Sequence, residues 1–185
     1  TPSHTDTKWI DYGRDNYAGV TFGNAPDNRR IFIGWMSNWD YAAKLDSQIW
    51  RGSMTAAREL HILEVNNNLY LSALPIAELQ AAHDYTFNLS LDKDVEITIG
   101  DDKEKVVITY NAADKKIYVD RSAAWFTQFE ESIQVTRPVE LHEFTIRILL
   151  DHGSLELFVP EAAIALTCLH TLPASSTVLQ KTAKR

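Results

Sequence analysis

The stretch Ile31-Phe-Ile-Gly-Trp-Met-Ser-Asn-Trp-Asp-Tyr41 begins with the apolar run of a buried strand and continues with indole, amide and carboxylate side chains. The isoleucines and the phenylalanine suit the interior of a sheet. The two tryptophans beside Asn38 and Asp40 are not required by a strand core. An indole ring can cover the apolar C–H face of a sugar while neighbouring polar groups bind its hydroxyls. The stretch therefore predicts a strand that leads into a carbohydrate-binding surface.

Trp35 and Trp39 are the candidates for lining a sugar pocket. They lie four residues apart, so on a strand their side chains face the same side. The same geometry suits two aromatic residues in the core of a sheet, and both interpretations stay open. We expect one of the two indoles to contact sugar, whereas Asn38 is expected to be structural. Trp50 and Arg51 follow closely and are expected to pack the sheet.

The composition argues against several classes of partner. The chain has 185 residues, 45% of them hydrophobic, which is enough for a sizeable core in one domain or two small ones. The 18 Lys and Arg against 25 Asp and Glu give a formal charge of −7, which argues against nucleic acid and against an anionic membrane surface. No apolar run approaches the roughly 20 residues that span a bilayer. The six histidines lack the spacing of metal ligands, so we expect neither a metal nor a cofactor.

Short strands separated by polar turns recur along the chain, and helical patterns are almost absent. Apolar and polar residues alternate most clearly after residue 84. Turn signals such as Asn66-Asn-Asn68 and Asp151-His-Gly153 separate the strands. About ten short strands at this spacing predict a β-sandwich or part of a β-propeller. The connector 74–83 has helix-forming residues after a proline, which predicts one or two helical turns.

Aromatic residues gather again in the segment 122–135, which is expected to be a long loop around a buried cluster. Trp125, Phe126 and Phe129 have two interpretations, a platform that binds carbohydrate or a plug between two parts of the fold, and the plug is favoured. The single cysteine, Cys168, lies in a predicted strand and is interpreted as a small buried hydrophobic residue. The polar tail 175–185 is expected to be frayed.

Several stretches resemble the C-terminal part of glycoside hydrolase family 32, which holds the invertases, inulinases and levanases. They are Asp11-Tyr-Gly-Arg-Asp-Asn-Tyr-Ala18, Arg30-Ile-Phe-Ile-Gly-Trp-Met-Ser-Asn-Trp39, Trp50-Arg-Gly-Ser-Met-Thr55, Arg58-Glu-Leu60, Leu74-Pro-Ile-Ala-Glu-Leu79, Tyr118-Val-Asp-Arg-Ser122 and Ser154-Leu-Glu-Leu-Phe-Val159. Each string alone is a weak signal. Their common order and spacing over nearly the whole chain make a strong match.

The resemblance implies a specific architecture. The family's fold is a five-bladed β-propeller followed by a β-sandwich. We therefore expect an all-β chain that forms the last blade and then the C-terminal β-sandwich. Residues 1–72 would complete the propeller, residues 73–83 would be a linker, and residues 84–185 would form the sandwich. A single blade leaves its flanking faces uncovered, so we expect association with a missing N-terminal propeller segment or self-association.

The resemblance also implies a chemistry whose acidic residues this chain lacks. The family hydrolyses β-fructofuranosyl bonds with retention, using one carboxylate as nucleophile and a second as general acid/base. The chain has no Asn-Asp-Pro-Asn-Gly, Arg-Asp-Pro or Glu-Cys-Pro string, which are the family's catalytic motifs. We expect no catalytic residue here, no hydrolysis by the chain alone, and a fructose-containing saccharide as ligand of the complete protein. The family resemblance favours a secreted or extracellular location.

Asp11 and Arg14 lie in the family motif that borders the site of the leaving sugar. The resemblance implies that they form a charge-assisted pair that contacts sugar hydroxyls. Taken without the resemblance, both residues suit a solvated turn before the next strand. Asp40 is expected to cap a turn or to bind Arg51 or Arg58.

Two rival interpretations remain for the chain as a whole. In the first, the chain is a non-catalytic module in which the sandwich, with Trp125 as its platform, or the Trp-rich blade binds fructan. In the second, the sandwich is purely structural and covers a face of the propeller. The resemblance implies that linkage preference, between sucrose, inulin and levan, is set largely by loops of the other propeller blades.

Overall fold

The computed structural model describes residues 7–45, 52–126, 128–129 and 132–183. Within these residues the regular structure is β-strand, apart from three single-turn 3-10 helices at Pro26–Asn28 (η2), Ser122–Ala124 (η3) and Pro160–Ala162 (η4). The prediction of an all-β chain is confirmed. Among the described helices, none has the length and apolar character that crossing a membrane requires.

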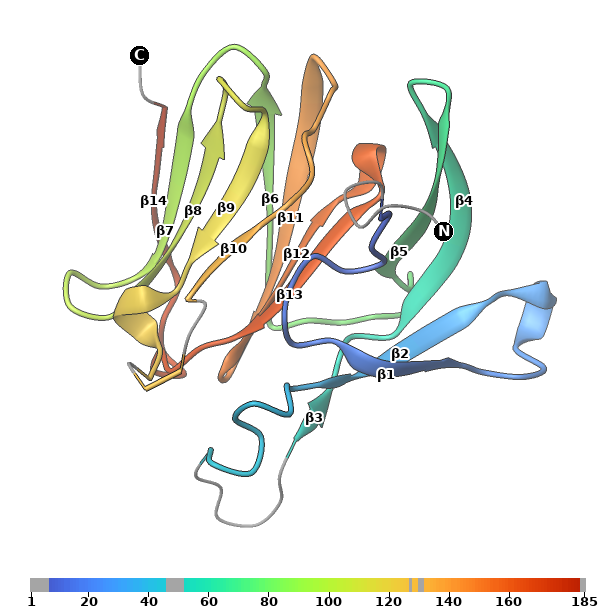
Figure 1. The fold of residues 1–185 in the computed structure, drawn as a ribbon, viewed down its shortest axis with the longest axis horizontal. Helices are drawn as coiled ribbons and strands as arrows, with labels where there is room; N and C mark the ends of the chain where they lie inside the picture. The colour runs from blue at the N-terminus through green and yellow to red at the C-terminus, as the bar shows by residue number, and fades with distance from the viewer. Residues whose placement is uncertain (1–6, 46–51, 127, 130–131, 184–185) are drawn as a thin grey trace.

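The first sheet comes from the N-terminal part of the chain (Figure 1). Its strands are β1 (Tyr17–Thr21), β2 (Ile31–Met36), β3 (Ser53–Met54), β4 (Arg58–Val65) and β5 (Asn68–Pro75). Their order is β1-β2-β4-β5, and the short β3 also pairs with β2. Asn66 and Asn67 join β4 to β5 with φ angles of +49° and +61°. This is the primed-turn geometry that asparagine tolerates in a two-residue hairpin.

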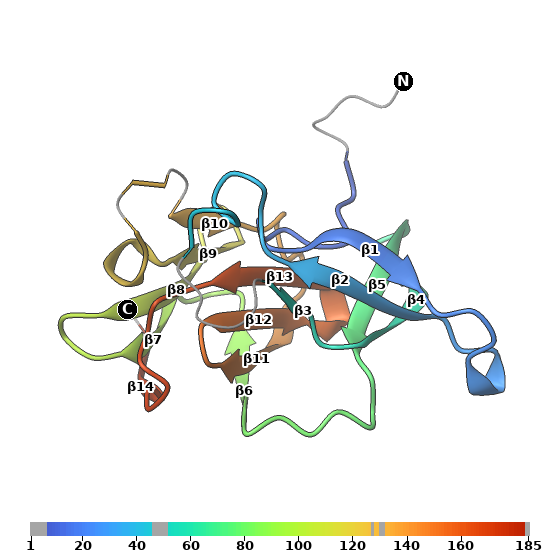
Figure 2. The same ribbon diagram turned by 90° about the horizontal axis from the view of Figure 1, so that it is seen from below.

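Two further antiparallel sheets follow. The five-stranded sheet has the order β10-β9-β8-β7-β14, from β7 (Val95–Gly100), β8 (Lys105–Asn111), β9 (Lys116–Asp120), β10 (Ile133–Val135) and β14 (Val178–Ala183). The four-stranded sheet has the order β13-β12-β11-β6, from β6 (His83–Ser90), β11 (Glu143–Asp151), β12 (Ser154–Val159) and β13 (Ile164–Leu169). Figure 1 shows the four-stranded sheet between the other two, and Figure 2 shows the arrangement from below.

The main hydrophobic core lies between the four-stranded and five-stranded sheets. The alternation of apolar and polar residues places every second side chain of these strands in it. Ile97 and Ile108 face it from one sheet, and Ile146 and Leu157 face it from the other. Cys168 is fully buried in the same core, and burial raises the pKa of its thiol to about 12. It is the small buried residue that the sequence predicts.

The four-stranded sheet is covered on its second face as well, by the N-terminal part of the chain. Leu149, Phe158 and Ala165 form a small buried cluster there, and Ala56 and Leu74 from the first sheet's side pack against it. As a result β12 is almost entirely buried rather than buried on alternate residues. The first sheet contacts the rest of the molecule at this second face. The buried side chains of Arg58 and Glu156 lie in the same interface.

Two local expectations from the sequence are wrong. The connector 74–83 contains no helix, because β5 continues to Pro75, a turn follows at residues 77–78, and β6 begins at His83. The tail does not fray over its whole length, because β14 pairs antiparallel with β7. Without β14, the strand β7 would present an unpaired edge, and the pairing satisfies its backbone groups.

Candidate functional site

A buried ionic cluster joins the first sheet to the four-stranded sheet. Arg58, the first residue of β4, is fully buried. Its Nη1 donates to Asp11 Oδ2 at 2.7 Å and its Nη2 donates to Glu156 Oε2 at 2.5 Å. The guanidinium also lies over the Phe158 ring, 4.9 Å from the ring centroid. Glu156 Oε1 accepts from the backbone N–H of Ala56 at 2.8 Å, so both carboxylate oxygens are used.

Asp11 is the hub of this cluster. Besides Arg58, its carboxylate accepts from the backbone N–H of Gly13, from the Asn16 amide, and from both the backbone N–H and the hydroxyl of Thr167. Burial by itself would raise the pKa of the Asp11 carboxyl, but Arg58 and the hydrogen bonds from Thr167 and Asn16 outweigh it, and the pKa lies below its ordinary value. The carboxylate is therefore held ionised by protein groups on every side.

The segment 11–15 runs along the free edge of β13. The backbone N–H of Tyr12 donates to Ala165 O at 2.8 Å, and that of Asp15 donates to Thr167 O at 3.3 Å. Gly13 makes the close approach possible, since a Cβ there would lie 1.9 Å from Thr167 O. The edge strand of the four-stranded sheet is thus covered by the beginning of the chain.

A second buried group lies four residues further along the same segment. Asp15 is fully buried, and its Oδ2 accepts from Arg121 Nη1 at 3.0 Å and from the backbone N–H of Leu169 at 2.8 Å. Its Oδ1 accepts a hydrogen bond from the Tyr41 hydroxyl. Burial raises the pKa of Asp15 despite these donors. Burial and the neighbouring carboxylate raise the pKa of Tyr41, so its hydroxyl stays protonated and donates.

Aromatic side chains are exposed on the other side of β2. Trp35 is paired in register with Tyr17 of β1 and with Met54 of β3. Trp39, three residues beyond the end of β2, is 71% exposed, and its ring centroid lies 5.0 Å from that of Trp35 with a tilt of 53°. Tyr17 meets the Trp35 ring edge-on at 6.3 Å. We call the exposed surface formed by these four side chains the aromatic face.

Charged and amide groups border the aromatic face. Arg14 forms an ion pair with Asp40. The Asn38 side chain donates to the Arg14 carbonyl at 3.1 Å and accepts from the backbone N–H of Asp40 at 3.0 Å. Indole rings with a guanidinium and a carboxylate beside them are the chemistry that binds a sugar by its C–H face and its hydroxyls.

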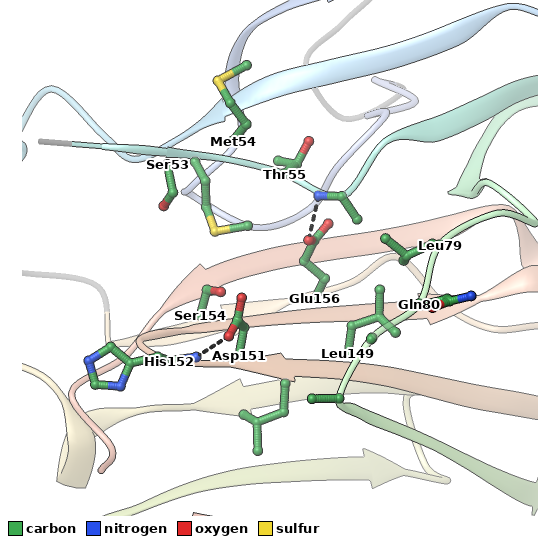
Figure 3. Close-up of a pocket in the computed structure, with 15 residues that line it drawn as sticks. Ser53, Met54, Thr55, Leu79, Gln80, Leu149, Asp151, His152, Ser154 and Glu156 are labelled. Atoms are coloured by element: carbon green, nitrogen blue, oxygen red, sulfur yellow. Dashed lines mark hydrogen bonds between the residues drawn. The ribbon is translucent and has the colours of Figure 1, made fainter. Parts of the chain in front are cut away.

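A cleft of about 420 Å³ opens at the junction of the first sheet with β11 and β12 (Figure 3). Met36 and Leu149 contribute apolar walls, and Ser154, Asp151 and His152 line it from the turn between β11 and β12. Glu156 lies in this cleft with its hydrogen bond to Ala56. In the described part of the chain no group of three His, Cys, Asp or Glu side chains is arranged to hold a metal ion.

Two models of known protein domains match this chain. The model of the glycosyl hydrolases family 32 N-terminal domain matches residues 1–73, and that of the family's C-terminal domain matches residues 52–169. The chain belongs to glycosyl hydrolase family 32. The resemblance found in the sequence motifs is confirmed.

Individual family 32 proteins are similar over most of this chain. Levanase from Bacillus sp. (strain L7) is 26% identical in an alignment that covers 80% of this chain and 20% of that protein. Exo-inulinase from Aspergillus awamori has a TM-score of 0.70 at 20% identity, covering 95% of this chain and 43% of that one. β-Fructofuranosidase from Schwanniomyces occidentalis, solved with fructosyl-erythritol, has a TM-score of 0.70 at 17% identity, covering 99% and 47%. The chain spans less than half the length of each of these family 32 proteins.

The structure separates the candidate residues of this family 32 chain into two places. Trp35, Trp39 and Arg14 lie at the aromatic face or on its border, whereas Asp11 lies in the buried cluster with Arg58 as its charged partner. Asp40 binds Arg14 rather than Arg58. Trp50 and Arg51 are outside the described residues.

The cluster at Trp125 has the geometry of a plug. Trp125 is 8% exposed, and its ring lies 5.0 Å from that of Tyr41 and 3.9 Å from the Arg121 guanidinium. Phe129 packs against the same Tyr41 ring at 5.2 Å. The aromatic cluster of the segment 122–135 therefore contacts the loop after β2, and Trp125 presents little surface to a ligand.

Four residues of the two buried groups had no role predicted from the sequence. They are Glu156, Thr167, Arg121 and Tyr41. Glu156 offered a signal, because an acidic residue in the apolar run Leu155 to Val159 needs a charged partner if the strand is buried. The other three carry no such local signal.

Proposed function

We propose that the complete protein is a retaining β-fructofuranosidase that releases terminal fructose from sucrose, inulin or levan. In this proposal residues 1–72 form the last blade of a five-bladed propeller, residues 73–83 are the linker, and residues 84–185 form the β-sandwich. The nucleophile and the general acid/base lie on a further, N-terminal segment, and the chain described here hydrolyses nothing by itself. Membership of family 32 and the absence of the three catalytic strings support this division.

The aromatic face is the part of this chain that we propose to contact the fructose-containing saccharide. Trp39 carries the proposal, because it is 71% exposed beside a second indole and takes no part in the core of this chain. Arg14 would bind hydroxyls at the border of the site. For Asp11 we propose an indirect part, in which it fixes the segment that carries Arg14 to β13.

Replacing Trp39 with alanine is expected to weaken binding of a short levan or inulin oligosaccharide by about tenfold, the effect of losing one stacked aromatic ring. Titration calorimetry with the chain, alone and mixed with an N-terminal segment that carries the three motifs, measures the change. Trp9→Ala is the matched control, since Trp9 is exposed but outside the aromatic face. Equal affinities of the Trp39→Ala variant and the unchanged chain would contradict the assignment.

Mixing the two segments is expected to restore fructose release from sucrose. The physical reason is that the first sheet leaves apolar side chains uncovered, among them Val20 on β1, Ile62 on β4 and Leu69 on β5. A neighbouring blade would bury them, and the same surface would let the chain associate with itself in the absence of a partner. Release of fructose is measured on the mixture and on each segment alone. A folded mixture without activity would argue against the proposal. Activity of this chain alone would refute the placement of the nucleophile and the general acid/base on a separate segment.

The rival proposal, a fructan-binding module built on the segment 122–135, has less support. It needs Trp125 as a platform, and that indole is covered by Tyr41 and Phe129. In the titration described above, loss of binding in Trp125→Ala with normal binding in Trp39→Ala would favour the rival.

A further inference from the structure

The loop that carries Trp39 is held in place by its neighbours rather than by Trp39 itself. The loop follows β2 at Met36, and the Trp39 ring is mostly exposed. Its ring contact is with Trp35, which is itself only half-buried. A contact between two side chains at the surface fixes a loop weakly, because both can change rotamer. The position of Trp39 must therefore be set by the residues on either side of it.

On the C-terminal side, Tyr41 ties the loop to distant parts of the chain. It is 1% exposed, and its hydroxyl donates to Asp15. Asp15 in turn is fixed by Arg121 and by the backbone N–H of Leu169, both of which belong to the C-terminal half. Arg121 Nη1 also donates to Leu169 O at 2.7 Å, so this one nitrogen binds both Asp15 and β13. This chain of hydrogen bonds begins two residues from Trp39 and ends in β13.

The ring of Tyr41 is also packed on several sides by other side chains. Trp125 meets it edge-on at 5.0 Å, Phe129 lies at 5.2 Å, and the Arg121 guanidinium lies 5.9 Å from its centroid. On the N-terminal side of Trp39, Asn38 bonds to the carbonyl of Arg14. The loop is thus held by contacts on both sides of Trp39, and Tyr41 makes more of these contacts than Asn38.

We propose that Tyr41, held by Asp15 and Arg121, is a positioning residue that fixes Trp39 beside Trp35 and so forms the aromatic face. The consequence for saccharide binding rests on the proposed function. The C-terminal half then has a defined part in recognition: its Arg121 and Trp125 set the place of an indole that belongs to the first sheet, although neither of them lies at the aromatic face.

The test uses Tyr41→Phe, which keeps the ring and removes only the hydroxyl. Two indoles 5.0 Å apart and tilted by 53° couple their electronic transitions, so they give an exciton couplet in the far-ultraviolet circular dichroism spectrum. Trp39→Phe identifies the part of the couplet that belongs to this pair. We expect Tyr41→Phe to weaken that part, together with about fivefold weaker saccharide binding, the effect of one lost hydrogen bond.

Tyr110→Phe is the matched control. Tyr110 is 1% exposed and packs edge-on against Phe144 at 5.0 Å, but its hydroxyl has no hydrogen-bond partner among the described residues. This variant should leave the couplet and the affinity unchanged. Asp15→Ala, which removes both acceptor oxygens, should reproduce the Tyr41→Phe effect from a position that does not touch the Trp39 ring. Cooperative thermal unfolding of each variant shows that the fold persists.

The outcomes separate the two proposals. An unchanged couplet in both Tyr41→Phe and Asp15→Ala would overturn the positioning role, whatever happens to binding. The absence of a Trp39-dependent couplet from the unchanged chain would overturn it as well. A weakened couplet with saccharide affinity unaltered in both Tyr41→Phe and Trp39→Ala would support the positioning role and refute the assignment of the saccharide to the aromatic face.

Discussion

Arg58→Met is expected to lower the free energy of unfolding by about 3–5 kcal/mol, because it leaves two buried carboxylates without their counter-ion. Asp11 and Glu156 lie 2.7 Å and 2.5 Å from the guanidinium, and their side chains are 3% and 7% exposed. Methionine fills much of the volume of the arginine stem, so the loss is one of charge rather than of packing. Urea unfolding of the variant and the unchanged chain at neutral pH gives the difference.

The pH dependence of that difference tests its cause. In the unchanged chain Arg58 helps to hold the pKa of Asp11 below its ordinary value, so Asp11 contributes stability above that ordinary value, and the contribution is lost as pH falls through the lowered pKa. In Arg58→Met the Asp11 carboxyl takes up its proton at higher pH, and the destabilisation should shrink as the pH is lowered. Arg58→Met with Asp11→Asn and Glu156→Gln should also recover part of the loss.

Arg147→Met is the control for a charge at the surface. Arg147 pairs with Asp84 at 2.7 Å, but both side chains are about one-third exposed, so the expected change is below about 1 kcal/mol. A loss for Arg58→Met no larger than that of Arg147→Met, or one that does not depend on pH, would contradict the view that Arg58 compensates buried charge.

His170 is expected to make the fold less stable by about 3 kcal/mol as the pH falls from 6.5 to 4. The residue is buried, and its Nδ1 accepts from the backbone N–H of Leu172 at 3.2 Å, which requires an unprotonated nitrogen. Burial is the main cause that lowers its pKa from 6.5 to about 4. The unfolded chain therefore binds a proton over a pH range in which the folded chain does not. Stability is fully present above pH 6.5 and is lost progressively down to pH 4.

The measurement compares unfolding free energies of His170→Gln and the unchanged chain across this pH range. The difference between the two proteins isolates His170, because Asp15, whose raised pKa acts in the opposite direction, is common to both. His142→Gln is the control, since His142 is exposed. A pH dependence that persists undiminished in His170→Gln would show that other groups cause it.

The strand character of this protein could be predicted from local sequence, and so could part of the aromatic face. Alternation of apolar residues predicted the strands that enclose the main core, and the asparagines at 66–68 predicted the hairpin turn. The pattern around Trp35 and Trp39 identified two indoles that lie in contact, one half-buried and one exposed. The expectation of a frayed tail at 175–185 fails for residues 178–183, because whether a polar strand pairs depends on an unpaired edge elsewhere, here that of β7.

The sequence by itself determined the period of side chains along each strand, the turns and the family motifs, because these depend on residues within a few positions of each other. Only the tertiary structure decided which charges meet. Asp11 and Glu156 are 145 positions apart and share Arg58, and Tyr41 and Arg121 are joined through Asp15. The cost of desolvation requires every buried charge to have a partner, but it is the same whichever partner is present. The packing of the sheets therefore decides which two charges meet.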